Sequence, residues 1–302
     1  MTAAPAAPVA PTAAIASLGM YDFGPAMAAN DRFWALIRDH LRAAGHAAPD
    51  HLTRGPDAYW PAWESPGLVL SQTCGYPYRA RLHGRVTLVA TPDYGLPGCG
   101  PGEYCSVFVA RRDDPRQGLR DFADAALAFN EDMSQSGWAA PATHLLSLGL
   151  TPRPALRSGG HRLSAQAVAA GRADLAALDA LTWAMLQGQE PACDALRVID
   201  RTTPTPALPF VAGPGADRAA LLAALRAAHA ALSPADRTTL HLQGIAEIPA
   251  ATYLAVPTPP APAHLAGPIR QIDATTPPFR LNLRCIEGKS APYWPDNHRM
   301  AQ

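Results

Sequence analysis

Short apolar runs alternate along this chain with segments whose apolar residues recur at helical spacing, and this alternation constrains the fold more than any other feature. Short apolar runs are typical of buried strands, whereas apolar residues at every third or fourth position indicate amphipathic helices. Strands that alternate with helices predict parallel sheets with helices on both faces. With 302 residues, the chain is long enough for two such units.

The individual elements are expected at the following positions. Strands are expected over the apolar runs 15–20, 68–70, 86–90, 106–110, 126–129, 155–157, 175–178 and 196–199. Helices or helical turns are expected over 78–82, 136–148, 161–170, 182–187 and 217–232. A further helix is expected to end at Arg42 and to begin at a cap provided by Asn30 or Asp31.

The two ends of the chain differ from the middle. Residues 1–13 are rich in alanine and proline, which predicts a disordered lead-in. They lack the basic and apolar segments of a secretory signal, so the chain as given is expected in the cytoplasm, or in the periplasm if a signal was removed. Residues 267–302 are expected to form a C-terminal extension. The chain has no apolar run of the roughly 20 residues that a membrane span requires.

Composition excludes several kinds of chemistry. The 25 basic and 25 acidic side chains cancel, which argues against a nucleic-acid partner. Lys289 is the only lysine and follows no phosphate-binding motif, so P-loop and pyridoxal-phosphate chemistry are effectively excluded. The five cysteines have no CxxC spacing, which is poor evidence for a structural zinc site or a disulfide framework. The sequence therefore predicts no cofactor and no metal.

Polar clusters follow several of the expected strands. Ligands of open α/β sheets bind beyond the carboxyl ends of the strands, so these clusters are the candidate site. They comprise residues 21–22, 71–75, 93–95, 130–137 and 158–161, with Asp179 as a smaller one.

The segment Ser134-Gln135-Ser136-Gly137 is the most informative of these clusters. Hydroxyls and a glycine at the start of a helix offer side-chain and backbone donors to an oxyanion. The alternative is that Ser134 or Ser136 only caps the helix. A second hydroxyl-rich turn, Ser71-Gln72-Thr73, follows another strand and could face the same cleft.

Each remaining candidate has a functional and a structural interpretation. His161 either donates to an anion or shuttles a proton, or it is a histidine that caps a helix. Asp179 either accepts from a ligand or caps the next helix. Cys74 is either a nucleophile or a buried structural cysteine. Cys99 and Cys105 lie in a glycine- and proline-rich loop, where they either pair or stay free.

Aromatic residues are the remaining candidates. Tyr21, Tyr94 and Trp138 either form the walls of a cleft or belong to the core. Because aromatics make up 7% of the chain, core packing is a strong alternative.

From about residue 14 to residue 257, the sequence resembles the substrate-binding proteins of phosphate, phosphite and phosphonate ABC transporters, which have the type 2 periplasmic-binding fold. The resemblance is carried most specifically by Ser134-Gln135-Ser136-Gly137 and its following Pro141. Further similar segments are 16–21, 106–111, 122–130, 160–161 and 171–179.

The resemblance implies two lobes, a two-strand hinge and a ligand in the cleft between the lobes. The first lobe would comprise residues 14–107 and 204–266, and the second 108–203. Ser134, Gln135, Ser136 and Gly137 would hold the oxyanion, and His161 and Asp179 would contact it or its substituent. Tyr21, Ser71, Gln72 and Thr73 would close from the first lobe. The implied partners are a small anionic, phosphonate-like ligand and an ABC permease.

Two other functions remain open on the same scaffold. The first is a cytosolic enzyme for a small anionic metabolite that uses Cys74, His161 or Asp179, which the missing signal and the additional cysteines favour. The second is a cytosolic sensor or adaptor whose closed form binds a protein partner. The fold alone does not distinguish these functions from a non-catalytic binding protein.

Overall fold

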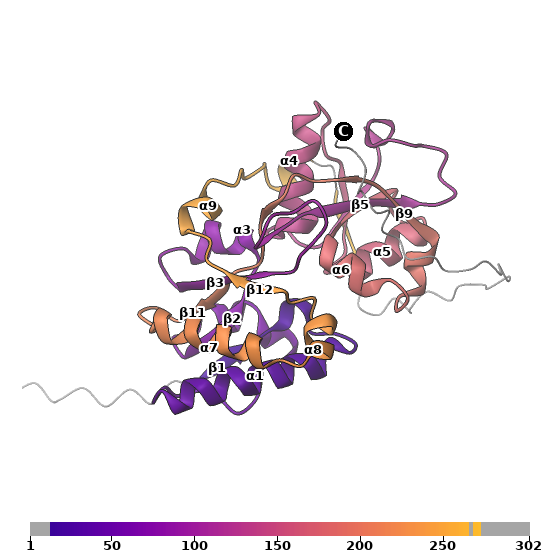
Figure 1. Cartoon of the computed structure of the whole chain (residues 1–302). Coiled ribbons are helices and arrows are strands. Elements are labelled where there is room, and N and C mark those ends of the chain that lie inside the picture. The colour runs from indigo at the N-terminus through magenta and orange to yellow at the C-terminus, as the bar shows by residue number, and fades with distance from the viewer. Residues whose placement is uncertain (1–12, 266–267, 273–302) are drawn as a thin grey trace, which may run out of the picture.

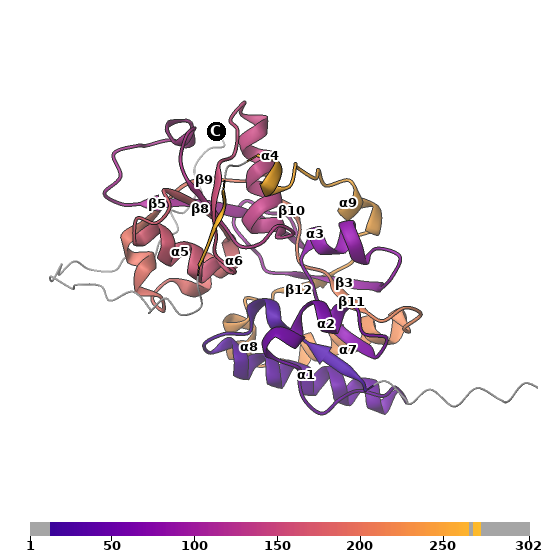
Figure 2. The same ribbon diagram turned by 180° about the vertical axis from the view of Figure 1, so that it is seen from behind.

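A computed structural model of the chain describes residues 13–265 and 268–272. It contains two sheets with helices on both, joined by a short two-stranded ribbon (Figures 1 and 2). We call each sheet with its helices a lobe, so the expectation of a two-lobed α/β fold is confirmed. The predicted lead-in at 1–13 lies outside the described residues except for its last residue.

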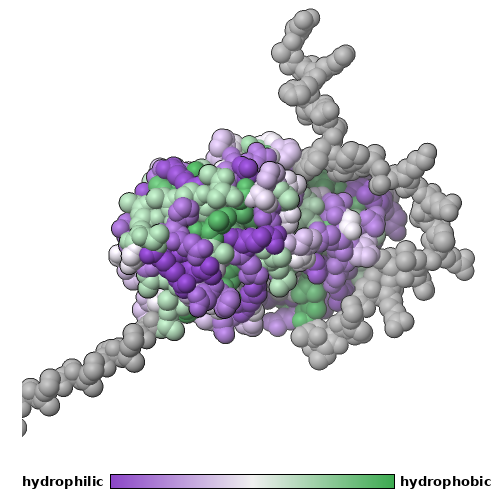
Figure 3. All heavy atoms as spheres, turned by 60° about the horizontal axis from the view of Figure 1, so that its bottom comes forward, coloured by the Kyte–Doolittle hydropathy of each residue, from purple (hydrophilic) through white to green (hydrophobic). Residues whose placement is uncertain are grey.

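The sheet of the first lobe has five strands in the order β1-β2-β11-β3-β12. Their bounds are β1 Ile15–Ser17, β2 Leu68–Gln72, β11 Phe210–Ala212, β3 Thr87–Asp93 and β12 Gly244–Ala246. The helices of this lobe are α1 Ala26–Ala43, α2 Trp60–Trp63, α3 Gly75–Pro77, α7 Arg218–Ala231, α8 Pro234–Thr239 and α9 Ala250–Leu254. The face of the molecule that carries α1, α7 and α8 mixes hydrophilic residues with small hydrophobic patches (Figure 3).

Pairing in this first sheet differs from the expected mostly parallel arrangement. Only β1 and β2 pair in parallel, whereas β11 is antiparallel to both β2 and β3, and β12 is antiparallel to β3. The reason is that β11 belongs to the segment returning from the second lobe and inserts between two strands that would otherwise be neighbours. Its three residues follow a proline-rich stretch and give little sequence signal.

The sheet of the second lobe has six strands in the order β13-β7-β6-β8-β5-β9. Their bounds are β13 Arg270–Gln271, β7 Pro154–Arg157, β6 Leu127–Phe129, β8 Leu175–Asp179, β5 Ser106–Arg111 and β9 Leu196–Arg201. Strands β13, β7, β6 and β8 pair in parallel, and β5 is antiparallel to its neighbours β8 and β9. The helices of this lobe are α4 Ala140–Ser147, α5 His161–Ala169 and α6 Ala180–Leu186.

Both faces of this second sheet are apolar because successive side chains of a strand point to opposite faces. In β5, Val107 and Val109 join the core beneath α5 and α6, whereas Phe108 and Ala110 join the core with Trp138 and α4. This double burial explains why the central strands appear in the sequence as continuous apolar runs.

The chain passes between the lobes through the ribbon formed by β4 (Glu103–Tyr104) and β10 (Thr205–Pro206), which pair antiparallel. It passes a third time after α9, where the indole nitrogen of Trp138 donates to the carbonyl of Pro260 at 3.2 Å. Strand β13 then adds to the edge of the second sheet. The lobe limits at 107/108, 203/204 and 266/267 stay predictions, and most of the expected C-terminal extension lies outside the described residues.

The cap expected for the first helix is wrong. The helix α1 begins at Ala26 after Pro25, whose fixed φ favours a helical start, and Asn30 is buried within it. The amide of Asn30 donates instead to Asp22 Oδ1 at 3.1 Å and to the carbonyl of Tyr21 at 3.4 Å. The residue thus holds the loop after β1 against the helix.

Candidate functional site

A cavity of about 670 Å³ lies between the two lobes, at the ends of β1, β6, β7 and β8. Its walls include five of the predicted site residues, which come from both lobes: Tyr21, Ser134, Ser136, His161 and Asp179. The structure therefore brings together side chains that are up to 158 positions apart in the sequence. Cys74, the candidate nucleophile, also lines this cavity.

The turn that follows β6 is held in place by its own residues. Ser134 is the N-cap of a π-helical turn, Gln135–Ala139, that continues into α4, and its hydroxyl accepts from the amide of Gly137 at 2.9 Å. The hydroxyl of Ser106, in β5, donates to the carbonyl of Ser136 at 2.9 Å. Because the Ser134 oxygen accepts from Gly137, its own O–H proton remains available as a donor.

Gly137 is required by the close approach of neighbouring side chains. A Cβ at this position would lie 2.7 Å from Asn130 Cγ and 3.0 Å from Ser134 Oγ. We expect Gly137→Ala to lower the free energy of unfolding by about 1–3 kcal/mol, the usual cost of overpacking. Urea denaturation measures this loss. Gly118→Ala is the control, because no atom lies within 4 Å of its Cβ position, and equal losses in the two variants would contradict the steric account.

Ser136 and His161 form a hydrogen-bonded pair on the wall of the cavity. The Oγ of Ser136 lies 2.9 Å from Nε2 of His161, the first residue of α5. Burial lowers the pKa of His161 to about 3, so the imidazole is neutral near pH 7. When Nε2 carries the ring proton, the imidazole donates to Ser136, and the hydroxyl proton of Ser136 can then be donated to an anion or to its neighbour Tyr104.

Asp179 and Tyr21 connect the lobes across the cavity. The phenol of Tyr21 donates to Asp179 Oδ2 at 2.8 Å, and Asp179 Oδ1 accepts from the amide of Thr182 at 2.9 Å. Asp179 is therefore the cap of α6 as well as a lining residue, so both interpretations of this aspartate apply. Burial raises the pKa of Asp179 to about 6, although its hydrogen bonds partly oppose the shift.

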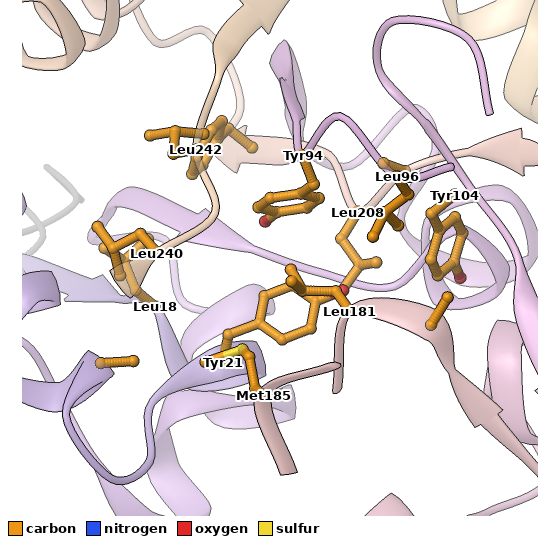
Figure 4. Close-up of a cluster of buried hydrophobic side chains, with 14 of the residues drawn as sticks. Leu18, Tyr21, Tyr94, Leu96, Tyr104, Leu181, Met185, Leu208, Leu240 and Leu242 are labelled. Carbon is orange, nitrogen blue, oxygen red and sulfur yellow. The ribbon is translucent and has the colours of Figure 1, made fainter. Parts of the chain in front are cut away.

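Tyr21 is also packed against apolar side chains of both lobes. It lies beside Leu181 and Met185 of α6, and its ring makes an edge-on contact with Tyr94 at 5.3 Å (Figure 4). Tyr94 therefore supports Tyr21 rather than lining the large cavity. Trp138, another expected wall residue, is fully buried in the core of the second lobe, where it contacts Phe129.

The other predicted ligand-binding residues lie behind the cavity wall. Strand β2 continues to Gln72, so Ser71 and Gln72 are part of the sheet instead of a turn beyond it. Ser71 contacts Ser17 and Trp63, and Gln72 donates to the Tyr94 hydroxyl at 2.7 Å. Thr73 is completely buried.

Gln135 likewise lies behind the wall, because its side chain points toward the first lobe. Its Oε1 accepts from Arg79 at 2.5 Å. Gly137 contributes to the turn through its amide and is not itself among the lining residues.

Cys74 lacks the surroundings of an activated nucleophile. Its Sγ accepts from the amide of Gln135 at 3.3 Å and lies 3.9 Å from the hydroxyl of Tyr104. Burial raises the pKa of Cys74, which keeps the sulfur protonated, and neither of these two neighbouring groups is a base. Cys99 and Cys105, which the sequence left open as a pair, are both free thiols.

Several lining residues were not predicted from the sequence. They are mainly aromatic residues of the first lobe, together with one arginine of the second: Phe23, Tyr59, Trp60, Trp63 and Arg162. Asn130 and Glu131 also line the cavity, and they belong to the polar cluster 130–137 that the sequence predicted. The run Tyr59-Trp60-Pro61-Ala62-Trp63 was a usable signal, because it concentrates three aromatic residues in a chain with few of them.

The described part of the chain was also searched for metal sites and for helices that could span a membrane. Within residues 13–265 and 268–272, no group of three or more His, Cys, Asp or Glu side chains is arranged to hold a metal ion. None of the helices described there is both long and apolar enough to span a bilayer.

Comparison with solved structures shows the same fold in several other proteins. PhnD1 from Prochlorococcus marinus, solved with methylphosphonate, is 17% identical, and the match covers 80% of this chain and 94% of that one with a TM-score of 0.61. XAC2383 from Xanthomonas citri, solved with ATP, is 18% identical over 79% and 92% of the chains with a TM-score of 0.59. A binding-protein component of an ABC phosphonate transporter from Pseudomonas aeruginosa is 16% identical over 81% and 84%, also with 0.59.

Comparison with protein families gives a more specific result, although no curated protein sequence matched the chain. A family model described as "ABC transporter, phosphonate, periplasmic substrate-binding protein" matches residues 69–253, which is more than half of the chain. The matched segment contains the Ser134–Gly137 turn, His161 and Asp179. The resemblance stated from the sequence is thus confirmed, and the chain belongs to the family of periplasmic substrate-binding proteins of phosphonate ABC transporters.

Proposed function

We propose that this protein binds one small oxyanion of the phosphonate or phosphate type in the cavity between its lobes, without transforming it. The observation that carries the proposal is the grouping of the Ser134 and Ser136 hydroxyls with the neutral His161 on one wall of that cavity. Tyr21 faces them from the first lobe. Closure of two lobes around a ligand is a common way for such binding proteins to work.

The charges around the cavity indicate how an anion would be held. Arg162 is the one arginine among the described residues that line the cavity, and its Nε lies 3.5 Å from Oε2 of Glu190. Asp22, Glu131 and Asp179 are also lining residues, and Asp22 is paired with Arg54 at 2.6 Å. The anion would therefore be bound by neutral donors rather than by a bidentate ion pair. Hydrogen bonds from neutral donors to a charged group each contribute roughly 1.5–3 kcal/mol.

The pair of Ser136 and His161 has the spacing of a nucleophile and a base, but its chemistry favours binding. A histidine whose pKa is about 3 is a poor acceptor for a serine proton near neutral pH. The carboxylate oxygens of Asp179 accept from Tyr21 and Thr182, so this aspartate does not orient the imidazole as a third catalytic group would.

Isothermal titration calorimetry with methylphosphonate and with inorganic phosphate tests the proposal. We expect one site per chain and binding that is micromolar or tighter. After incubation, the ³¹P NMR spectrum should show the ligand unchanged. Absence of binding for every oxyanion tested, or conversion of the ligand, would contradict a binding protein.

The proposal extends to the cellular setting. The family is described as periplasmic, which favours the periplasm over the cytoplasm among the two locations that the sequence left open. In that setting the partner of the closed, ligand-bound form is the permease of an ABC transporter. Fractionation of the native host tests the location, and a protein found with the cytoplasmic fraction would contradict it.

A further inference from the structure

The lobes already contact each other around the cavity, yet a large volume remains between them. Tyr21 reaches Asp179 at 2.8 Å, and the guanidinium of Arg162 lies 5.5 Å from the ring centre of Phe23, so both contacts join the lobes. About 670 Å³ nevertheless remains. Cavities of about 300–1,000 Å³ typically hold organic ligands of drug size. A bare oxyanion, or one with a single methyl group, would leave most of this space to water.

The wall contributed by the first lobe is aromatic and fixed in position. Trp63 is 3% exposed, and its indole nitrogen donates to Ser71 Oγ at 3.1 Å and to the carbonyl of Gln72 at 3.2 Å. Tyr59 donates to the carbonyl of Gly19 at 2.9 Å. The rings of Tyr59 and Trp60 both meet Trp63 edge-on, with centroids 6.0 and 5.1 Å away. We call Tyr59, Trp60 and Trp63 the aromatic wall.

These contacts make the aromatic wall a preorganised surface for an apolar group. Tyr59 is 38% exposed although it is a large side chain with its hydroxyl already bonded, and Trp60 is half-buried. A flat apolar body in the cavity would cover the exposed parts of these rings. Burying apolar area stabilises a complex by roughly 25 cal/mol per Å². Because the rings are held in place before binding, little side-chain entropy is lost.

The carboxyl groups of the cavity limit the charge of that body. Asp22 is paired with Arg54, and both oxygens of Asp179 accept hydrogen bonds from the protein. Glu131 is half-buried among the lining residues, and burial raises its pKa, which indicates that ionisation is disfavoured there. A second anionic group on the ligand would face these carboxyls. Because these carboxyls are already partnered or disfavoured as anions, they offer a cationic substituent little charge pairing, whereas the aromatic wall offers an uncharged substituent apolar area to bury.

We propose that the ligand is an oxyanion that carries an uncharged aromatic or bulky apolar substituent. Its head group lies at Ser134, Ser136 and His161, and its substituent lies on the aromatic wall. This inference rests on the proposed function, since it assumes that the cavity binds an oxyanion, and it adds the chemical class of the substituent.

Calorimetry with three probes tests the inference: methylphosphonate, phenylphosphonate and 2-aminoethylphosphonate. We expect phenylphosphonate to bind at least tenfold more tightly than methylphosphonate. Trp60→Ala should weaken the binding of phenylphosphonate about tenfold more than that of methylphosphonate and so remove this advantage, whereas Trp60→Phe should restore most of it. Met27→Ala is the control, because Met27 is 41% exposed and is not among the lining residues.

The possible outcomes separate the two proposals. If none of the three probes binds, the proposed function itself fails. If methylphosphonate and phenylphosphonate bind equally, or if Trp60→Ala weakens both equally, oxyanion binding stands and the aromatic substituent is refuted. If 2-aminoethylphosphonate binds most tightly and Glu131→Gln abolishes its advantage, the substituent is cationic, which also overturns the inference.

Discussion

Replacing both Ser134 and Ser136 by alanine is expected to weaken the binding of methylphosphonate at least tenfold while the protein stays folded. The two hydroxyls are the side-chain donors of the turn that lines the cavity. Each hydrogen bond to a desolvated anion contributes roughly 1.5–3 kcal/mol, and about 1.4 kcal/mol corresponds to a factor of ten in affinity. Calorimetric titration of the double variant beside the wild type measures the effect.

The double variant also removes a helix cap, so it needs a matched control. Ser134 caps the π-helical turn through the amide of Gly137, and Ser233 caps α8 in the same way through the amide of Asp236 at 3.1 Å. Ser233 is not among the residues that line the cavity. Ser233→Ala should therefore lower stability by about 1 kcal/mol, as loss of a cap usually does, and leave affinity unchanged. An unchanged affinity in the Ser134/Ser136 double variant would remove these residues from the site.

Stability should depend on pH through two neighbouring groups that act in opposite directions. The pKa of His161 is lowered to about 3 in the folded protein. The stabilisation that neutral His161 gives the folded state is therefore fully present above about pH 6.5 and is lost as the pH falls below that value. The pKa of Asp179 is raised to about 6 in the folded protein. The stabilisation that protonated Asp179 gives the folded state is therefore fully present below about pH 4 and is lost as the pH rises to 6. When the pKa values of the folded and unfolded states differ by one, stability changes by about 1.4 kcal/mol, so each group changes it by a few kcal/mol.

Two variants separate these contributions. Between pH 6 and pH 4, His161→Gln should become more stable relative to the wild type as the pH falls, because the variant no longer has a histidine to protonate on unfolding. Asp179→Asn should become less stable relative to the wild type over the same interval, because it loses the opposing contribution. Urea denaturation at a series of pH values gives both differences. If either difference is flat across this interval, that group is not buried as described.

Much of the fold is predictable from local sequence because the strands of the second lobe are buried on both faces. The residues of β5 and β8 are apolar at every position but the ends, so these strands are visible as continuous runs. Strand direction is a different matter, since it depends on where the chain travels between elements. The antiparallel strand β11 has three residues and follows a segment that returns from the second lobe. The local sequence pattern of these residues does not indicate the direction in which the chain enters the first sheet.

Some residues of the candidate site were also predictable from the local sequence, and others were not. Ser134, Ser136, His161 and Asp179 were predictable because each lies at the end of a strand of the second lobe or shortly after it, close to the start of a helical segment. The segment from Ser71 to Thr73 was not placed correctly in space, because β2 is longer than its apolar run and includes Ser71 and Gln72. The aromatic wall was missed because it comes from short helical pieces around α2, which are too short to show periodicity.

The most direct test of the account is a crystal structure of the wild-type protein with methylarsonate, an oxyanion whose arsenic atom gives an anomalous signal. We expect one strong arsenic peak per chain in the cavity between the lobes, with the oxygens of methylarsonate within hydrogen-bond distance of Ser134 Oγ and Ser136 Oγ. An arsenic peak elsewhere on the molecule, with the cavity free of it at saturating ligand, would contradict the central claim.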